Sequence, residues 1–232
     1  MERYLEELKA GKIKKIKLLG DSITHGIGGT GYCMDGEPIA ANFFRNPNGY
    51  CWAKLFKEYI EGKYGVSVVN NGCSGTNSQF ILQHFDTLVE KDDDLIFCMI
   101  GTNNRHQYKT AGEEKKSREE MGKLFYDSVL QMYEFFKVKD KRVIFMVNIP
   151  ASQANEQGTE SYWRILHMDD INAIYKAAQK KAGFPLISLY DMFTQYLEKR
   201  GETVEEYLRD GLHPNDKGYE VMFTLLIDKL AL

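Results

Sequence analysis

Two short polar segments near opposite ends of the chain hold the residue types that nucleophilic catalysis needs. Ser22 stands in residues 20–24, directly after an apolar run, and Asp210 and His213 stand in residues 210–215. A serine hydroxyl becomes a nucleophile when a base takes its proton and a third group fixes the tautomer of that base. The three side chains could therefore form a catalytic triad for acyl transfer.

The spacing of Asp210 and His213 fits this interpretation. Because residues three apart in a turn lie on the same side, Asp210 can accept a hydrogen bond from one ring nitrogen and leave the other for Ser22. Pro214 disfavours a helix at His213, and Asn215 is a good N-cap for a final helix. Taken alone, an Asp–Ser pair after a strand more often caps a helix, and such a histidine is more often structural.

Acyl transfer also requires hydrogen-bond donors where negative charge develops on the substrate. Residues 70–77 (NNGCSGTN) and residues 101–104 (GTNN) each follow a further apolar run. A glycine N–H in the first segment, or an asparagine amide in the second, could approach a substrate closely. Both segments are also ordinary turn sequences, so neither is strong support by itself.

The segments that must position these residues alternate between strand and helix patterns. Short, continuously apolar runs predict five strands buried on both faces, at residues 13–19, 66–70, 95–100, 143–147 and 186–189. Apolar residues spaced three and four apart predict helices within residues 52–59, 171–178 and 219–230. The alternation predicts a three-layer α/β/α sandwich that forms a single domain over residues 1–232, with its site at the carboxyl ends of the strands.

In combination, four segments resemble the SGNH, or GDSL-type, hydrolase family. They are GDSIT at 20–24, NNGCSG at 70–75, GTNN at 101–104 and DGLHPN at 210–215, and they span nearly the whole chain. The resemblance implies a flavodoxin-like sheet of five parallel strands. It also implies a catalytic triad of Ser22, His213 and Asp210.

The same resemblance implies an oxyanion hole. Its donors would be the backbone of Ser22, the backbone of Gly75 and the side chain of Asn103. Gly75 is preferred to Gly72 because the family's donor glycine usually lies at about this distance from the asparagine that ends the strand, here Asn70.

The chain departs from the family pattern in two places. Asn104 stands where many members have aspartate, which leaves the mechanism intact because this is not a triad position. Residues 25–49 form an extended segment rich in Gly, Asn and Pro. Such a segment could be a lid, a pocket wall or a dimer contact, and nothing in the sequence specifies the oligomeric state.

The expected rim of the site is polar with a few aromatic side chains. We assign substrate binding to Asp21, Tyr50, Asn77, Asn104 and Arg105. Further rim candidates are Asn42, Arg45, Asn46, Asn48, Gln79, His106, Gln107 and Tyr108. This composition suits a hydroxyl-rich alcohol such as an acetylated sugar, whereas a long acyl chain would need an apolar groove that the sequence does not indicate.

We therefore expect a serine esterase for short-chain carboxylic esters, in particular O-acetyl groups on a carbohydrate-like substrate, that needs no metal and no organic cofactor. Lysophospholipase, thioesterase or arylesterase activity is the alternative within the family. The alternative to an enzyme is a non-catalytic ligand-binding module on the same fold.

Composition argues against several other classes. With 43% hydrophobic and 27% charged residues the chain can form a proper core, and its net charge of −3 gives no basic face for nucleic acid. No apolar run is long enough to span a membrane, and the charged beginning of the chain does not read as a signal peptide. Four scattered cysteines without a C-x-x-C pair suggest reduced thiols and a cytoplasmic protein.

Two motifs compete with the triad. Residues 26–31 match the dinucleotide pattern G-x-G-x-x-G, but they lack the helix and the acidic residue that such a site needs. Ser74 lies between glycines at the wrong spacing for a nucleophile elbow. Asp92, Asp93 and Asp94 read as a solvated turn.

Overall fold

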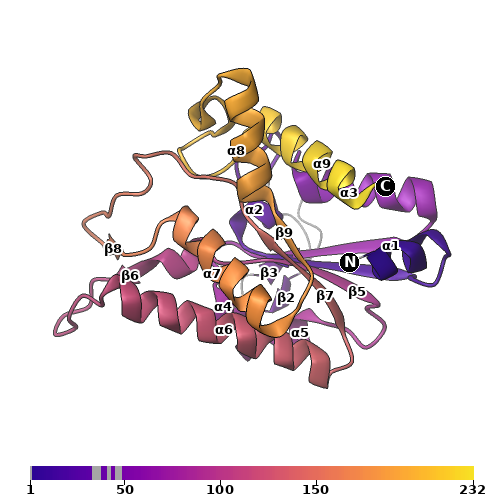
Figure 1. Ribbon diagram of the computed structural model, residues 1–232, viewed down its shortest axis with the longest axis horizontal. Coiled ribbons are helices and arrows are strands. Elements are labelled where there is room, and N and C mark those ends of the chain that lie inside the picture. Colours follow the sequence, from indigo (N-terminus) through magenta and orange to yellow (C-terminus); the bar gives the residue numbers. More distant parts are fainter. Residues whose placement is uncertain (1, 33–37, 41–42, 45–48) are drawn as a thin grey trace.

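The structure, a computed structural model, describes residues 2–32, 38–40, 43–44 and 49–232. A five-stranded parallel sheet forms its centre, in the order β4-β1-β5-β7-β9 (Figure 1). Counted along the chain, these strands follow the flavodoxin-like order 2-1-3-4-5. The prediction of five parallel strands is confirmed, and each predicted run overlaps one of them: β1 (Lys15–Gly20), β4 (Ser67–Gly72), β5 (Leu95–Met99), β7 (Arg142–Val147) and β9 (Leu186–Ser188).

Helices cover both faces of the sheet, as the predicted sandwich requires. One face packs against α1 (Glu2–Lys9), α3 (Trp52–Tyr64), α8 (Leu189–Arg200) and α9 (Asp216–Leu230). The other packs against α4 (Ser78–Gln83), α5 (Phe85–Leu88), α6 (Arg118–Val138) and α7 (Met168–Ala182). Because every residue of β5 is buried, the central strand is apolar without alternation.

Several short elements lie outside the predicted pattern. Two antiparallel pairs are present, β2 (Pro38–Ala40) with β3 (Phe43–Phe44) and β6 (His106–Tyr108) with β8 (Tyr162–Arg164). Two 3₁₀ helices, η1 (Thr102–Arg105) and η2 (Val204–Tyr207), each hold one turn. Elements this short carry too few residues for a periodic signal.

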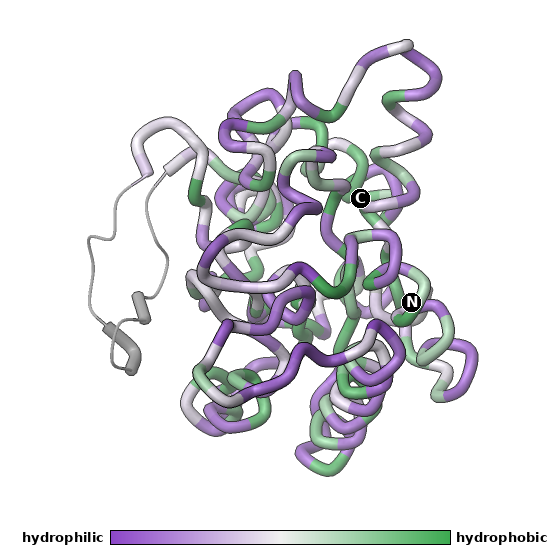
Figure 2. The backbone as a smooth tube through the Cα atoms, turned by 90° about the vertical axis from the view of Figure 1, so that its left-hand side faces the viewer, coloured by the Kyte–Doolittle hydropathy of each residue, from purple (hydrophilic) through white to green (hydrophobic). Residues whose placement is uncertain are grey.

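The carboxyl ends of the strands lie on the left of Figure 1, and α2 (Ser22–His25) follows β1 there. Figure 2 views the molecule from that side, where the loops nearest the viewer are mostly hydrophilic or neutral. Four of the expected rim residues lie outside the described residues, namely Asn42, Arg45, Asn46 and Asn48. No helix in the described part of the chain is both long and apolar enough to cross a membrane.

Candidate active site

Ser22 is the first residue of α2, at the point where β1 ends. The Asp21 carboxylate caps this helix, since its Oδ1 accepts a hydrogen bond from the Ile23 N–H at 3.0 Å. Ser22 is 5% exposed, so its hydroxyl lies just beneath the surface at the carboxyl edge of the sheet. The helix-cap interpretation therefore holds for Asp21, and it leaves the neighbouring serine free for another role.

The side chains of Ser22, His213 and Asp210 form one hydrogen-bonded chain. His213 Nε2 lies 2.9 Å from Ser22 Oγ, and His213 Nδ1 lies 2.7 Å from Asp210 Oδ2. A carboxylate can only accept, so Nδ1 carries the proton and Nε2 is the acceptor that faces the serine hydroxyl. This is the tautomer that a general base needs.

The Asp210 carboxylate is held in its ionised form. Its second oxygen accepts hydrogen bonds from the Leu212 N–H at 3.0 Å and the His213 N–H at 2.8 Å. Partial burial works against the charge, but the hydrogen bonds from the His213 ring and from these two backbone groups outweigh it and lower the pKa of Asp210. The carboxylate can therefore hold the imidazole even in mildly acidic solution.

The turn that carries His213 is fixed from several sides. Arg209 N–H donates to the His213 carbonyl at 2.8 Å, and Asn215 caps α9 through a bond from Gly218 N–H at 3.0 Å. Across the site, Ser152 N–H donates to the Gly211 carbonyl at 2.9 Å. Residue 152 belongs to a polar loop that no sequence motif marks, so sequence reasoning missed this support.

A second support comes from Gly28, in the segment that matches the dinucleotide pattern. A Cβ atom at Gly28 would lie 2.3 Å from the Pro214 carbonyl oxygen and 3.1 Å from His213 Cβ, and φ is +104°. The backbone of this loop therefore packs directly on the histidine turn. Nearby, Tyr219 Oη donates to the Ile27 carbonyl at 2.6 Å. A glycine at position 28 therefore allows the loop to pack closely on the histidine turn.

The expected oxyanion donors are linked to one another by hydrogen bonds. Cys73 N–H donates to the Gly20 carbonyl at 2.8 Å, which ties the turn containing Gly75 to the end of β1. Asn103 Nδ2 donates to the Thr76 carbonyl at 2.8 Å. An amide nitrogen carries two N–H groups, so one bond orients Asn103 and the other N–H remains for a substrate oxygen.

The two backbone donors also suit this role. Among the described residues, neither Ser22 N–H nor Gly75 N–H donates to a protein acceptor. Gly75 adopts φ +77°, and open space surrounds the position where a Cβ would stand. Both groups can therefore donate to a ligand.

Two residues that we assigned to substrate binding are buried instead. Asp21 is 0% exposed, and burial raises the pKa of its carboxyl group. Arg105 is also 0% exposed: its guanidinium pairs with Glu156 at 2.7 Å and donates to Asn155 Oδ1 at 3.1 Å and to the Thr102 carbonyl at 3.0 Å. Both side chains support the site from within and do not reach the surface, which corrects the expectation.

The remaining assigned residues lie around the site with structural bonds of their own. Asn77 caps α4 by accepting from Phe80 N–H at 3.0 Å. Asn104 bonds twice to Ser78, accepting from its N–H at 3.0 Å and donating to its hydroxyl at 2.8 Å. Tyr50 is half-buried against the core beside α3.

A pocket of about 300 Å³ opens beside Asn103. Polar side chains line part of it, and Met121, Leu124 and Phe125 of α6 line another part; its other residues are Asn77, Gln79, Asn104, His106 and Ser128. The sequence had indicated no apolar surface here, because the apolar face of α6 reaches the site only in the folded chain. The pocket offers room for an acyl or alcohol group next to an expected oxyanion donor.

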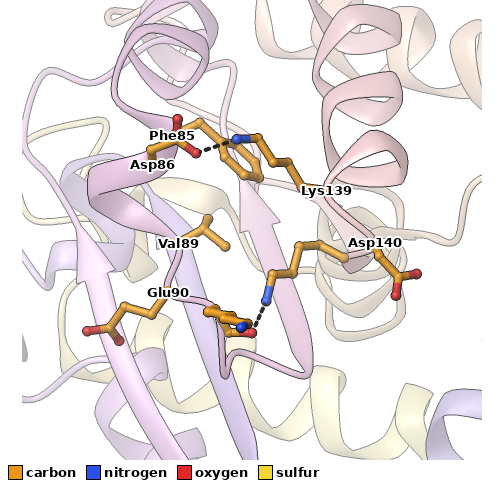
Figure 3. Close-up of a pocket in the computed structure, with 8 residues that line it drawn as sticks. Phe85, Asp86, Val89, Glu90, Lys139 and Asp140 are labelled. Atoms are coloured by element: carbon orange, nitrogen blue, oxygen red, sulfur yellow. Dashed lines mark hydrogen bonds and ion pairs between the residues drawn. The ribbon is translucent and has the colours of Figure 1, made fainter.

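A larger pocket, of about 430 Å³, lies at the opposite edge of the sheet (Figure 3). Lys139 pairs there with Asp86 at 2.7 Å, and Lys141 donates to the Lys91 and Asp93 carbonyls. Its lining contains neither a histidine nor a serine. We therefore assign the chemistry to the carboxyl edge.

The solvated turn predicted for Asp92, Asp93 and Asp94 is correct only for Asp92, which is exposed, whereas Asp94 is half-buried and Asp93 is buried. The side chain of Asp93 is fully buried, 3.6 Å from the equally buried Lys17 ammonium, which also pairs with Glu90 at 2.9 Å. Glu90, Asp92 and Asp93 are the one group within the described residues whose spacing could suit a metal ion. Lys15 and Lys17 already supply its positive charge.

A flavodoxin-like sheet with a serine, a histidine and an aspartate in hydrogen-bond contact at its carboxyl edge is the arrangement of a serine hydrolase. The GDSL-like lipase/acylhydrolase family model matches residues 18–221. The chain belongs to that family and is a carboxylic ester hydrolase. No curated protein sequence matches it.

Solved structures share the fold at low sequence identity. LAE5, an alpha/beta hydrolase from the metagenome of Lake Arreo, Spain, gives a TM-score of 0.67 at 18% identity, covering 94% of this chain and 95% of that one. Axe2, an acetylxylan esterase from Geobacillus stearothermophilus, gives 0.66 at 18% identity, with 94% of each chain covered. The two-domain esterase CEX, active on acetylated mannans, gives 0.64 at 18% identity, covering 99% of this chain and 52% of that one.

Proposed function

We propose that this protein is a serine esterase that removes O-acetyl groups from a carbohydrate substrate through Ser22, His213 and Asp210. The observation that carries the proposal is the contact between His213 Nε2 and Ser22 Oγ at 2.9 Å, with Asp210 at 2.7 Å from the other ring nitrogen. These distances lie within the range in which a base can take a proton from a hydroxyl.

The mechanism follows from this geometry. His213 takes the Ser22 proton as Oγ attacks the ester carbonyl, and Asp210 stabilises the imidazolium that forms. Ser22 N–H, Gly75 N–H and the Asn103 amide hold the negative oxygen of the tetrahedral intermediate. The alcohol leaves with the proton from His213, and water then attacks the acyl-enzyme by the same steps to release the acid.

Axe2 offers support for these residue roles. Its structures described as catalytic mutants replace one serine, one aspartate or one histidine by alanine, and that aspartate precedes that histidine by three positions. Asp210 and His213 have the same spacing. The named substrates of Axe2 and CEX, acetylated xylan and acetylated mannans, support a carbohydrate ester as the substrate.

A second candidate function is hydrolysis of esters with longer acyl chains. The apolar side chains of Met121, Leu124 and Phe125 in the pocket beside Asn103 favour it. An apolar wall stabilises each buried methylene by about 0.8 kcal/mol, so a fitting chain would lower KM. An acetyl group would leave most of such a pocket unfilled.

Two measurements test the proposal. Ser22→Ala should lower kcat on p-nitrophenyl acetate by roughly 10⁶, the scale found for other triad nucleophiles, and should abolish labelling by a fluorophosphonate. A loss below tenfold would remove Ser22 from the mechanism. Rates on p-nitrophenyl acetate, butyrate and palmitate, followed by acetylated xylo-oligosaccharides, then identify the acyl group. A preference for palmitate would replace the first candidate by the second.

A further inference from the structure

The β6–β8 ribbon gathers aromatic and cationic side chains on one face. In this antiparallel pair Tyr108 lies opposite Tyr162, and His106 lies opposite Arg164. Side chains alternate between the two faces of a strand, and residues opposite each other share a face. These four residues, which we call the aromatic face, therefore point to one side of the ribbon.

The rings of the aromatic face contact one another, with His106 and Tyr162 half-buried and Tyr108 exposed. The His106 ring centroid lies 5.0 Å from that of Tyr108 and 4.8 Å from that of Tyr162, and the two tyrosine centroids are 6.4 Å apart. Tyr108 is 66% exposed, whereas Phe135, another exposed aromatic side chain, is 36% exposed. Exposed rings gathered in this way commonly mark a binding surface.

The other face of the same ribbon is already occupied. Gln107 is 8% exposed, donates to the Glu114 carbonyl at 3.0 Å and accepts from the Lys116 N–H at 2.9 Å. Trp163, opposite Gln107, lies beneath the Lys109 ammonium at 5.7 Å. The ribbon is thus anchored on one side and presents its aromatic face on the other.

Charge on the aromatic face is confined to one guanidinium. The carbon of the Arg164 guanidinium lies 5.1 Å from the centroid of the Tyr162 ring, and its Nε donates to the Asn155 carbonyl at 3.2 Å. Burial, together with the nearby Arg164 and Arg105 cations, lowers the pKa of His106 to about 4. At neutral pH the face therefore offers neutral rings beside one fixed cation.

This face is continuous with the candidate active site. His106 lines both the aromatic face and the pocket that Asn103 borders. At the usual rise of about 3.3 Å per residue in a strand, Tyr108 lies roughly 7 Å beyond His106 along β6. A substrate whose ester carbonyl sits at Asn103 and which extends along β6 would therefore pass over these rings.

We propose that His106, Tyr108, Tyr162 and Arg164 form a subsite for sugar rings that neighbour the acetylated sugar. This inference rests on the proposed function and adds that the substrate is an oligosaccharide chain. The apolar C–H face of a pyranose can pack flat on one tyrosine ring, while the guanidinium and the tyrosine hydroxyls are available to the sugar hydroxyls. A single acetylated sugar would leave the outer ring, Tyr108, without a partner.

The kinetic test compares variants that keep an aromatic ring at position 108 with variants that remove it. For Tyr108→Ala and Tyr108→Leu, kcat/KM on acetylated xylotetraose relative to p-nitrophenyl acetate should fall about fivefold, mainly through KM, the scale of one aromatic contact. Tyr108→Trp should retain the wild-type ratio. Val138→Ala is the control and should leave the ratio unchanged. Val138 is 82% exposed and is the last residue of α6, at the end of that helix away from the pocket.

A binding measurement keeps the test independent of turnover. Calorimetry of Ser22→Ala with unacetylated xylotetraose should detect binding, and adding Tyr108→Ala should weaken it about fivefold. If neither protein binds the sugar, or if Tyr108→Ala changes neither the kinetic ratio nor the affinity by as much as twofold, the subsite proposal is wrong.

These results separate the subsite from the proposed function. If the wild-type protein deacetylates acetylated xylotetraose and the Tyr108 variants do so equally well, the subsite alone is overturned. Activity on p-nitrophenyl acetate without activity on any acetylated sugar overturns the carbohydrate function, and the subsite with it. If the wild-type protein is a dimer and the Tyr108→Ala variant is a monomer, the face binds a second copy of this chain, and the subsite is also overturned.

Discussion

Gly28→Ala tests whether the loop over residues 26–31 sets the position of the catalytic base. A methyl group at this position would lie 2.3 Å from the Pro214 carbonyl oxygen and 3.1 Å from His213 Cβ. Ordinary C···O contacts are about 3.3 Å, so the loop and the histidine turn must separate by roughly 1 Å. A displacement of that size at a reacting group can cost about 10² in rate, and we expect kcat on p-nitrophenyl acetate to fall by about that factor.

Gly31→Ala is the matched control in the same loop. Gly31 also has a positive φ, +72°, but no atom of the described residues lies within 4 Å of its Cβ position. Both variants place alanine at a positive φ, which costs roughly 1–2 kcal/mol near the left-handed region of Gly31 and more at the φ of +104° of Gly28, and only Gly28→Ala adds the collision with the histidine turn. Gly31→Ala should lower the free energy of unfolding while kcat stays within about twofold of wild type.

The assay pairs kcat with the rate of fluorophosphonate labelling, because both require His213 to activate Ser22. In Gly28→Ala the two rates should fall together, while the folded protein retains its circular dichroism spectrum. Equal loss of activity in both variants would show that backbone strain alone is responsible. A kcat within threefold of wild type in Gly28→Ala would refute the positional argument altogether.

Three further predictions follow from the same contacts. Asn103→Ala should lower kcat by roughly 10²–10³ with KM changed less than threefold, since the amide acts on charge that develops in the transition state; a kcat loss below tenfold would contradict its role. Arg105→Met should lower the free energy of unfolding by about 3 kcal/mol because Glu156 loses its buried partner, and the double variant with Glu156→Gln should recover part of that loss in urea titrations. His106 has its pKa lowered to about 4, so the unfolded chain binds a proton that the folded one does not. The free energy of unfolding should therefore fall as pH drops from about 6.5 to about 4, and His106→Asn should remove on the order of 2 kcal/mol of this dependence; an unchanged slope would contradict it.

The sheet could be predicted from sequence because its signal is local. Strands buried on both faces need continuous apolar runs, and each of the five runs overlaps a strand of the observed sheet. Parallel strands place their carboxyl ends at one edge, so the sequence predicts that Ser22 and Asn103 lie at the same edge of the sheet. By contrast, β6 and β8 have only three residues each and pair across more than fifty positions. No window of sequence holds that information.

Burial explains where prediction of the site failed. Arg105 and Asp21 are polar residues next to motif positions, and from sequence alone such residues are expected at the surface. In the folded chain Glu156 and Asn155, from a distant loop, cover Arg105 and satisfy its donors. Gly28 is a different case: the glycine pattern around it matches a dinucleotide motif whose context the sequence lacks, and no sequence signal indicates that its neighbour is the Pro214 backbone.

The two halves of the site are anchored in different ways, and this difference has a functional consequence. The proposed nucleophile and the proposed oxyanion donors are tied to the sheet, through bonds such as those from Cys73 N–H to the Gly20 carbonyl and from Asn70 Nδ2 to the Thr24 carbonyl, each 2.8 Å long. The proposed base, His213, is in contrast positioned by loops, through Gly28 and through the Ser152 N–H. Loops tolerate substitution better than strands do and also border the substrate. A change in these loops that reshapes the substrate site would therefore move His213 as well, so KM and kcat should change together when substrate preference is altered there.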